Sequence, residues 1–118
     1  MNLREGVRAL ILDEDDSILL LRFEWDAGRA EIGYWLVPSA RGRGAAAAAV
    51  RLLSRWALRE LGLARLALHT HEDNVASQRV AERAGFTREG LLRSFDTRGE
   101  RPRDLVVFSL LPSDLSSE

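Results

Sequence analysis

The sequence contains no cysteine and no apolar run of the ~20 residues that a membrane-spanning helix needs. The absence of cysteine excludes disulfides, thiolate metal sites and a cysteine nucleophile. Residues 1–5 lack the apolar core of a signal peptide, so we expect a cytoplasmic protein with no membrane partner. The formal net charge of -1 is also too small for a nonspecific nucleic-acid binder, which needs a strong excess of positive charge.

Length and composition indicate one globular domain. With 118 residues, of which 46 % are hydrophobic and 30 % charged, the chain fits a single core and is too apolar to be disordered. We therefore treat residues 1–118 as one domain, in which an N-terminal hairpin (1–25) precedes a larger core (27–111).

Hydrophobic periodicity predicts seven regular elements in the order β-β-β-α-β-α-β. Strands are expected at five apolar, β-prone stretches: Val7–Asp13, Ser17–Trp25, Ala30–Val37, Arg65–His71 and Asp104–Leu111. Helices are expected from Ala45 to a stop at Gly62, and over Val75–Ala84 with Asn74 as N-cap. The stretch that opens with Phe86 shows no regular pattern, and 112–118 is expected to be a frayed polar tail. This order favours a mixed sheet with helices packed on it.

The segment between the third strand and the first helix carries the strongest functional signal. Gly42 and Gly44 flank Arg43 directly before the helix that begins at Ala45. Backbone N–H groups at a helix start have no intrahelical partner, and the helix dipole makes that end electropositive. Glycine allows unusual backbone angles and close approach by a ligand. The segment is therefore typical of a nest that binds a pyrophosphate.

An ordinary tight turn between a strand and a helix is the alternative explanation for a bare Gly-x-Gly, and it accounts for the glycines about as well. The segment lacks the third glycine of a dinucleotide-binding loop and the Lys-Ser/Thr of a Walker A loop. The residues thus point to a nucleotide-type anion but fit neither of these two nucleotide motifs.

The run Arg41-Gly42-Arg43-Gly44-Ala45-Ala46 resembles the signature Arg/Gln-x-x-Gly-x-Gly/Ala of GNAT acetyltransferases, in particular the RimJ/RimL-type protein N-terminal acetyltransferases. Three further segments resemble that family in order and spacing: Ala30–Leu36, Asn74–Phe86 and Arg88–Arg93. The resemblance runs from Ala27 to Leu110. It implies an α/β (α+β) fold with a mixed, mostly antiparallel sheet, in which residues 27–111 form an acetyl-CoA-binding core.

The resemblance also assigns residues to the cofactor. The diphosphate of acetyl-CoA would lie against the cradle, which consists of Arg41, Gly42, Arg43, Gly44, Ala45 and Ala46. In the family the strand before the cradle parts from the next strand. Backbone groups near Trp35, Leu36 and Val37 would then bind the pantetheine arm and polarise the thioester carbonyl. Asn74 matches an asparagine that contacts the cofactor, although its simplest role is the helix N-cap.

Three side chains are candidates for proton transfer. Ser77 matches the position that in RimL-like enzymes is proposed to return a proton to the CoA thiolate, and Ala81 stands where many other members carry a tyrosine for this purpose. Glu31 matches the glutamate of histone-acetylating members, and Asp96 matches the acidic residue proposed in RimL-like enzymes. Either carboxylate could be the general base. Each could instead be a solvated surface group, which is the commoner fate of Asp and Glu.

His69 and His71 alternate onto one face of the expected strand Arg65–His71 and invite interpretation as metal ligands. No third ligand stands at a useful spacing, and the chemistry that the resemblance implies needs no metal. We therefore expect no metal site and interpret both histidines as polar residues near the end of a strand.

The sequence departs from the family before the hairpin. Members normally have an opening strand and two helices there, which form one wall of the acceptor pocket, whereas only a few residues precede the first expected strand here. A truncated or minimal form, a partner subunit that supplies the wall, or an N-terminal segment replaced by recombination would each explain this difference. The segment Val7–Phe23 also resembles the first strands of Nudix hydrolases, but the Glu-rich Nudix box is absent.

The leading hypothesis is an N-acetyltransferase that moves an acetyl group from acetyl-CoA directly to a primary amine, without a covalent enzyme intermediate. The expected acceptor is a protein or peptide N-terminus, with a small-molecule amine as second choice. A CoA-binding module without robust catalysis is the first alternative, because the acceptor wall is missing. The second alternative is an assembly element, in which an exposed sheet edge and an apolar face pair two copies into a homodimer.

Overall fold

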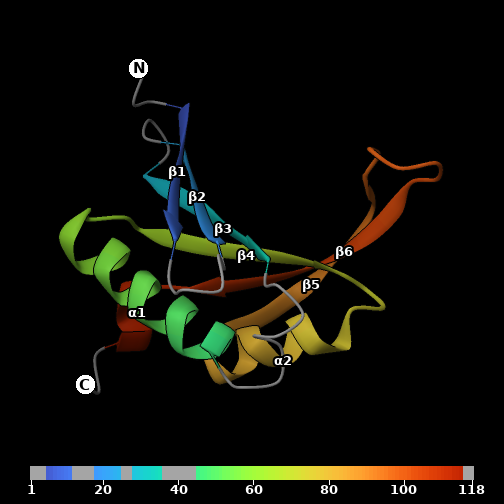
Figure 1. Ribbon diagram of the computed structural model, residues 1–118. Helices are drawn as coiled ribbons and strands as arrows, with labels where there is room; N and C mark the ends of the chain where they lie inside the picture. Colours follow the sequence, from blue (N-terminus) through green and yellow to red (C-terminus); the bar gives the residue numbers. More distant parts are fainter. Residues whose placement is uncertain (1–4, 12–17, 25–27, 36–44, 116–118) are drawn as a thin grey trace.

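The computed structural model describes residues 5–11, 18–24, 28–35 and 45–115, with side chains for 28–32 and 47–115. This part of the chain forms six strands, two α-helices and a short 3-10 helix (Figure 1). The strands are β1 (Glu5–Ile11), β2 (Ile18–Glu24), β3 (Arg29–Trp35), β4 (Arg65–His71), β5 (Thr87–Asp96) and β6 (Arg103–Leu110). The helices are α1 (Ala45–Glu60), α2 (Val75–Arg83) and the 3-10 helix η3 (Pro112–Leu115).

The six strands form one sheet in the order β1-β2-β3-β4-β6-β5. Every neighbouring pair is antiparallel except β3 and β4, which are parallel because α1 connects them as a crossover. This is the mixed, mostly antiparallel α/β (α+β) fold that the sequence predicts. β1 and β2 pair over their whole length, which confirms the predicted hairpin, while the hairpin tip lies outside the described residues.

Both α-helices lie on one face of the sheet (Figure 1). The predicted apolar stripe of α1 is buried in the core: Val50, Leu53 and Ala57. In β4 the burial alternates, with Leu66 and Leu68 in the same core and their neighbours only half-buried. The other side chains of β4, including His69 and His71, therefore face the side of the sheet opposite the helices, which we call the open face.

The helix ends follow the sequence signals. α1 ends at Glu60, and Gly62 has a φ of 65°, the left-handed conformation that glycine adopts at little cost after a helix. α2 begins after Asn74, as predicted, and Gly85 follows it with a φ of 95°. In the described part of the chain, no helix has the length and hydropathy needed to cross a membrane.

β5 corrects the sequence prediction, which left the stretch after Phe86 without regular structure. The strand pairs with β6, but its register shifts between Arg88 and Gly90 and again between Leu92 and Asp96. Irregularities of this kind break the alternation of apolar and polar residues along a strand. β5 also lies at the edge of the sheet with mostly exposed side chains, so no buried face imposes a pattern on its sequence.

The predicted frayed tail is wrong for its first four residues. Pro112–Leu115 form η3, where Asp114 Oδ2 accepts a hydrogen bond of 2.9 Å from the backbone N–H of Leu111. This turn carries Leu115 back to the core, where its side chain is buried. A single leucine in a polar segment shows no periodicity, so the burial of Leu115 could not be predicted from the sequence. Residues 116–118 lie outside the described residues.

Candidate active site

β3 and β4 run side by side at their starts and then separate. Their parallel ladder joins Arg29–Ile32 to Arg65–Leu68 and ends there. Among the described strands, the rest of β3 pairs with β2 alone, and the rest of β4 pairs with β6 alone. The sheet is therefore open between the last residues of β3 and β4, as the family resemblance implies. Backbone groups on the two sides of this gap have no partner in the β3–β4 ladder and can bind an extended ligand.

Most of the predicted cradle lies outside the described residues. Leu36, Val37, Arg41, Gly42, Arg43 and Gly44 belong to the segment between β3 and α1 that the structure does not describe. The structure does place both ends of that segment, because Trp35 is the last residue of β3 and Ala45 and Ala46 open α1. The first turn of α1 carries no acidic side chain. The positive end of the helix dipole is thus not neutralised from within the helix.

Asn74 and Ser77 meet at the start of α2. Asn74 Oδ1 accepts a hydrogen bond of 3.1 Å from the backbone N–H of Ser77, which is the geometry of an N-cap. Gln78 Nε2 donates to the backbone oxygens of His71 (3.4 Å) and Glu72 (2.8 Å). These bonds tie the first turn of α2 to the end of β4, so Asn74 and Ser77 lie at the same end of β4 as the gap.

Glu31 lies on β3 one residue before the ladder ends, and its carboxylate contacts a histidine of β4. Glu31 Oε1 is 3.1 Å from His69 Nδ1. His69 directly follows Leu68, the last residue of β4 that pairs with β3. The Glu31 side chain is 36 % exposed and the His69 side chain 18 %, so both are held in place yet accessible to a ligand. This pair lies where the two strands separate.

Asp96, at the end of β5, is held by two partners. Arg98 donates to it from Nε (2.9 Å, to Oδ1) and from Nη2 (3.2 Å, to Oδ2), and His71 Nε2 lies 2.8 Å from Oδ2. Hydrogen bonds from Arg98, first, and from His71 hold the pKa of Asp96 well below its ordinary value. A carboxylate with so low a pKa stays charged but is a weak proton acceptor. Its geometry suits the positioning of His71 better than the role of general base.

The structure thus brings each predicted carboxylate to a histidine, but it does not bring Glu31 and Asp96 to each other. Phe95, which directly precedes Asp96 in the chain, packs edge-on against the ring of His69, with centroids 5.6 Å apart and planes at 83°. Our interpretation of both histidines as simple polar residues was incomplete. The sequence indicated only that both histidines lie on one face of β4. Their role depends on the carboxylates that contact them, which come from β3 and β5. In the described ranges, no group of three or more His, Asp or Glu side chains could hold a metal ion.

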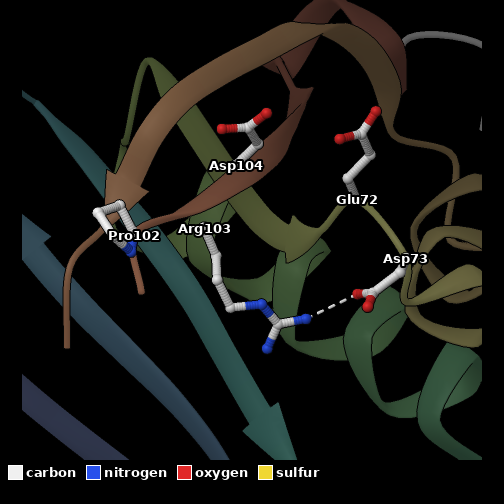
Figure 2. Close-up of a pocket in the computed structure, with 5 residues that line it drawn as sticks. All are labelled: Glu72, Asp73, Pro102, Arg103 and Asp104. Carbon is white, nitrogen blue, oxygen red and sulfur yellow. Dashed lines mark hydrogen bonds and ion pairs between the residues drawn. The ribbon is translucent and has the colours of Figure 1, made fainter. Parts of the chain in front are cut away.

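An open pocket of about 490 Å³ lies beyond the end of β4 (Figure 2). Its lining consists of Glu72, Asp73, Pro102, Arg103 and Asp104. Figure 2 shows Arg103 reaching across to Asp73, to which its Nη2 donates a hydrogen bond of 2.7 Å. Three carboxylates against one guanidinium make the lining negative, which disfavours a phosphate ligand. The pocket adjoins Asn74 and His71 in sequence but contains none of the predicted site residues, so we do not assign the cofactor to it.

Comparison with known proteins decides the family. Residues 2–87 match the family described as acetyltransferase (GNAT) domain. The chain belongs to the GNAT acetyltransferase family. Within it, the Bacillus subtilis (strain 168) protein named "Putative ribosomal N-acetyltransferase YdaF" is 39 % identical over 90 residues, which are 76 % of this chain and 49 % of that protein.

Two further GNAT proteins confirm the RimJ/RimL-like character of the chain. The ribosomal-protein-serine acetyltransferase of Escherichia coli (strain K12) is 31 % identical over 103 residues, covering 85 % of this chain and 58 % of that protein. The solved structure of RimL, a ribosomal L7/L12 alpha-N-protein acetyltransferase in complex with coenzyme A, is 27 % identical with a TM-score of 0.75, covering 80 % of this chain and 54 % of that one. The chain spans about half the length of the relatives it matches.

Proposed function

We propose that this GNAT domain is an N-acetyltransferase that moves an acetyl group from acetyl-CoA directly to a primary amine. The observation that carries the proposal is the gap between β3 and β4, which opens directly before the segment leading to the N-terminus of α1. An extended thioester arm needs backbone partners along its length, and its diphosphate needs a positive site. A gap followed by a helix start supplies both. Direct attack by the amine agrees with the absence of cysteine.

In this proposal the diphosphate of acetyl-CoA lies against the cradle Arg41–Ala46. The alanines that open α1 leave room for backbone N–H groups to approach phosphate oxygens. Backbone groups of Trp35, Leu36 and Val37 would bind the pantetheine arm and polarise the thioester carbonyl. Asn74, already the cap of α2, would add a polar contact from the other side of the gap.

The acetyl transfer requires that the acceptor ammonium lose a proton and that the CoA thiolate gain one. Glu31 belongs to the proton-accepting machinery in this proposal, because it lies at the point where the strands separate and is partly exposed. Ser77, in the first turn of α2, is the candidate that returns a proton to the thiolate. Asp96 is the weaker of the two carboxylate candidates for the base, since Arg98 and His71 lower its pKa.

The acceptor we propose is a protein or peptide N-terminus, with a small-molecule amine as second choice. The names of the relatives support this, because two of them act on ribosomal proteins by name. A cytoplasmic location belongs to the same proposal, since ribosomal proteins are found there. The carboxylates of the pocket beyond β4 also favour a cationic acceptor such as an ammonium group over an anionic one.

Calorimetric titration with acetyl-CoA tests the cofactor half of this proposal. Gly44→Glu should weaken binding by on the order of 100-fold, about 2.7 kcal/mol, because a carboxylate would clash with and repel the diphosphate. Gly99→Glu is the matched control: it makes the same substitution in the turn between β5 and β6, where an added Cβ would meet only an ordinary contact at 3.9 Å. Equal affinity of Gly44→Glu and Gly99→Glu would contradict the proposed cradle.

Release of free thiol from acetyl-CoA, measured with a panel of peptide and small amines, tests the transfer half. A CoA-binding module without robust catalysis is the alternative. It predicts micromolar affinity for CoA with no turnover on any amine. Pairing of two copies through the edge strands β1 and β5 is a separate alternative for the assembly, and a monomer by light scattering would remove it.

A further inference from the structure

The pair Glu31–His69 has a geometry that could not be expected from the sequence. The two residues come from different strands, separated by α1 in the chain. They meet beside the last rung of the β3–β4 ladder, with Glu31 one residue before that rung on β3 and His69 one residue after it on β4. His69 Nδ1 lies 3.1 Å from Glu31 Oε1 on the open face of the sheet. Phe95 packs edge-on against the imidazole from β5. The ring is therefore fixed in two directions, by a carboxylate and by an aromatic side chain.

The contact with Glu31 determines which nitrogen of His69 carries the proton. An ionised carboxylate can only accept hydrogen bonds, so the Nδ1 that faces it must be the donor. In a neutral imidazole with a proton on Nδ1, Nε2 bears the lone pair and can accept a proton. The carboxylate would then stabilise the imidazolium that results, as in other carboxylate–imidazole pairs. Fixing the tautomer and the ring orientation is the role of a positioning residue.

We propose that His69 is the general base of the acetyl transfer and that Glu31 positions it. The inference rests on the proposed function. His69 Nε2 takes one proton from the acceptor ammonium, and the nitrogen lone pair thus freed attacks the thioester carbon to form the C–N bond. The tetrahedral intermediate then expels the thiolate as the C–S bond breaks. Of the two protons that remain on the nitrogen, one stays on the amide and the other reaches the thiolate through Ser77, as in the proposed function, while His69 releases its proton to water.

Among the side chains that the structure describes, the charged groups around His69 come from three elements. Glu31 faces it from β3, Asp96 lies at the end of β5 with Arg98 two residues later, and His71 lies two residues along β4. Val107, the partner of His69 on β6, is apolar. Arg98 also interacts favourably with Glu31 at longer range.

His71 is the weaker candidate for the base, because its carboxylate is shared with Arg98. The Asp96 carboxylate accepts two hydrogen bonds from the Arg98 guanidinium as well as the contact with His71 Nε2. The Arg98 guanidinium already offsets part of the negative charge of Asp96, which reduces the stabilisation that this carboxylate can give to an imidazolium at His71. His71 also lies two residues beyond the point where β3 and β4 separate.

Kinetics with acetyl-CoA and a peptide amine test the proposal. His69→Gln should lower kcat/KM at neutral pH by about 10²- to 10³-fold and remove the acidic limb of the pH profile, since general-base catalysis contributes on that order. Affinity for acetyl-CoA by calorimetry should change by less than about twofold. In His69→Ala, added imidazole should restore turnover. Glu89→Gln should leave kcat/KM unchanged, because it removes a carboxylate from the same face of the sheet at the far end of β4.

A readout that needs no turnover tests the positioning step. Nitrogen-15 NMR of the histidine rings should show His69 in the Nδ1–H tautomer in the wild type. In Glu31→Gln that tautomer should lose its preference, and the acidic limb of the pH profile should move. A wild-type His69 protonated on Nε2, or tautomer populations unchanged in Glu31→Gln, would overturn the positioning role.

The outcomes separate this inference from the proposed function. If the wild type binds acetyl-CoA but acetylates no amine, the proposed function fails and the inference fails with it. If the wild type turns over while His69→Gln retains kcat/KM within about threefold, the inference alone is wrong. If His69→Gln is poorly folded, the addition of imidazole to His69→Ala decides the matter. Failure of imidazole to restore turnover would count against His69 as the base.

Discussion

The two ends of β4 are built differently, although they belong to one strand of seven residues. At its start, Arg65 lies in the ladder with β3, and its guanidinium holds Glu89 of β5 through hydrogen bonds of 2.6 and 2.9 Å. At its end, His69 and His71 lie beyond that ladder, and each contacts a carboxylate from a different strand. Both arrangements bridge strands across the open face of the sheet, and the contacts between β4 and β5 span the intervening β6.

The difference between the ends lies in what each can do chemically. Arginine stays charged at every physiological pH and matches a carboxylate with a rigid pair of donors, so the Arg65–Glu89 bridge can only hold strands together. Histidine is the side chain whose protonation changes near neutral pH, so the far end of the strand can move protons. The division falls at Leu68, where pairing with β3 stops. The start of β4 thus links strands through a permanent ion pair, whereas the end of β4 carries side chains that can transfer protons.

The largest effect on folding should come from the start of β4, where the strand pairs with β3. Leu66→Ala removes a side chain with 0 % exposure from the core, which should lower the free energy of unfolding by about 2–5 kcal/mol. Urea denaturation measures this loss. Leu52→Ala is the matched control on α1, where the side chain is 70 % exposed, and it should stay within about 0.5 kcal/mol of the wild type. A loss below about 1 kcal/mol in Leu66→Ala would contradict the structural role of this end.

A smaller effect is expected at Asn74, which links the far end of β4 to α2. Asn74→Ala removes the acceptor for the Ser77 N–H and should cost about 1 kcal/mol of stability. Asn74→Asp keeps that acceptor and should restore stability, but it adds a negative charge and should weaken binding of acetyl-CoA. Thermal melting and calorimetry on both variants separate the two roles. Equal affinity for acetyl-CoA in Asn74→Asp and the wild type would leave Asn74 as a cap alone.

The smallest effect should come from the Arg65–Glu89 bridge, and it should depend on pH. The bonds from Arg65, first, and from Ser109 lower the pKa of Glu89 from 4.5 to about 2. A carboxyl group whose pKa is lower in the folded state stabilises the protein above its unfolded pKa and loses that contribution as the pH falls toward the folded value. Glu89→Gln should therefore cost less than about 1 kcal/mol at pH 7, because both side chains are about one-third exposed or more.

Urea denaturation of Glu89→Gln and the wild type at pH 7, 4 and 3 measures this dependence. The difference in unfolding free energy should shrink progressively between pH 4.5 and about 2. A difference that stays constant over this range would show that the lost charge is not its cause.

Much of the fold could be predicted because its signals are local. The apolar stripe of α1, the cap at Asn74 and the glycine after α1 depend on residues that are close in sequence, and the structure confirms all three. β5 and Leu115 were missed because their places depend on distant partners. Register shifts against β6 remove the alternation of β5, and Leu115 is buried only because η3 returns it to the core.

The candidate site shows the same limit. The glycine cradle can be read from consecutive residues, and the carboxylates Glu31 and Asp96 follow from the family resemblance. That each contacts a histidine of β4 could not be read from the sequence, since Glu31 and His69 are far apart in the chain and Asp96 reaches His71 across β6. Without those contacts, the two histidines had no visible function.

The sequence by itself indicated the family, through motifs that resemble it, and predicted the order of the elements apart from β5 and η3. The predicted elements follow from short-range rules of periodicity and helix capping. The cradle that we propose for the diphosphate of acetyl-CoA likewise consists of consecutive residues. Only the tertiary structure decided where β3 and β4 separate and which carboxylate orients which imidazole. Side chains from different strands meet through sheet register, and register is set by the packing of the whole sheet against its helices.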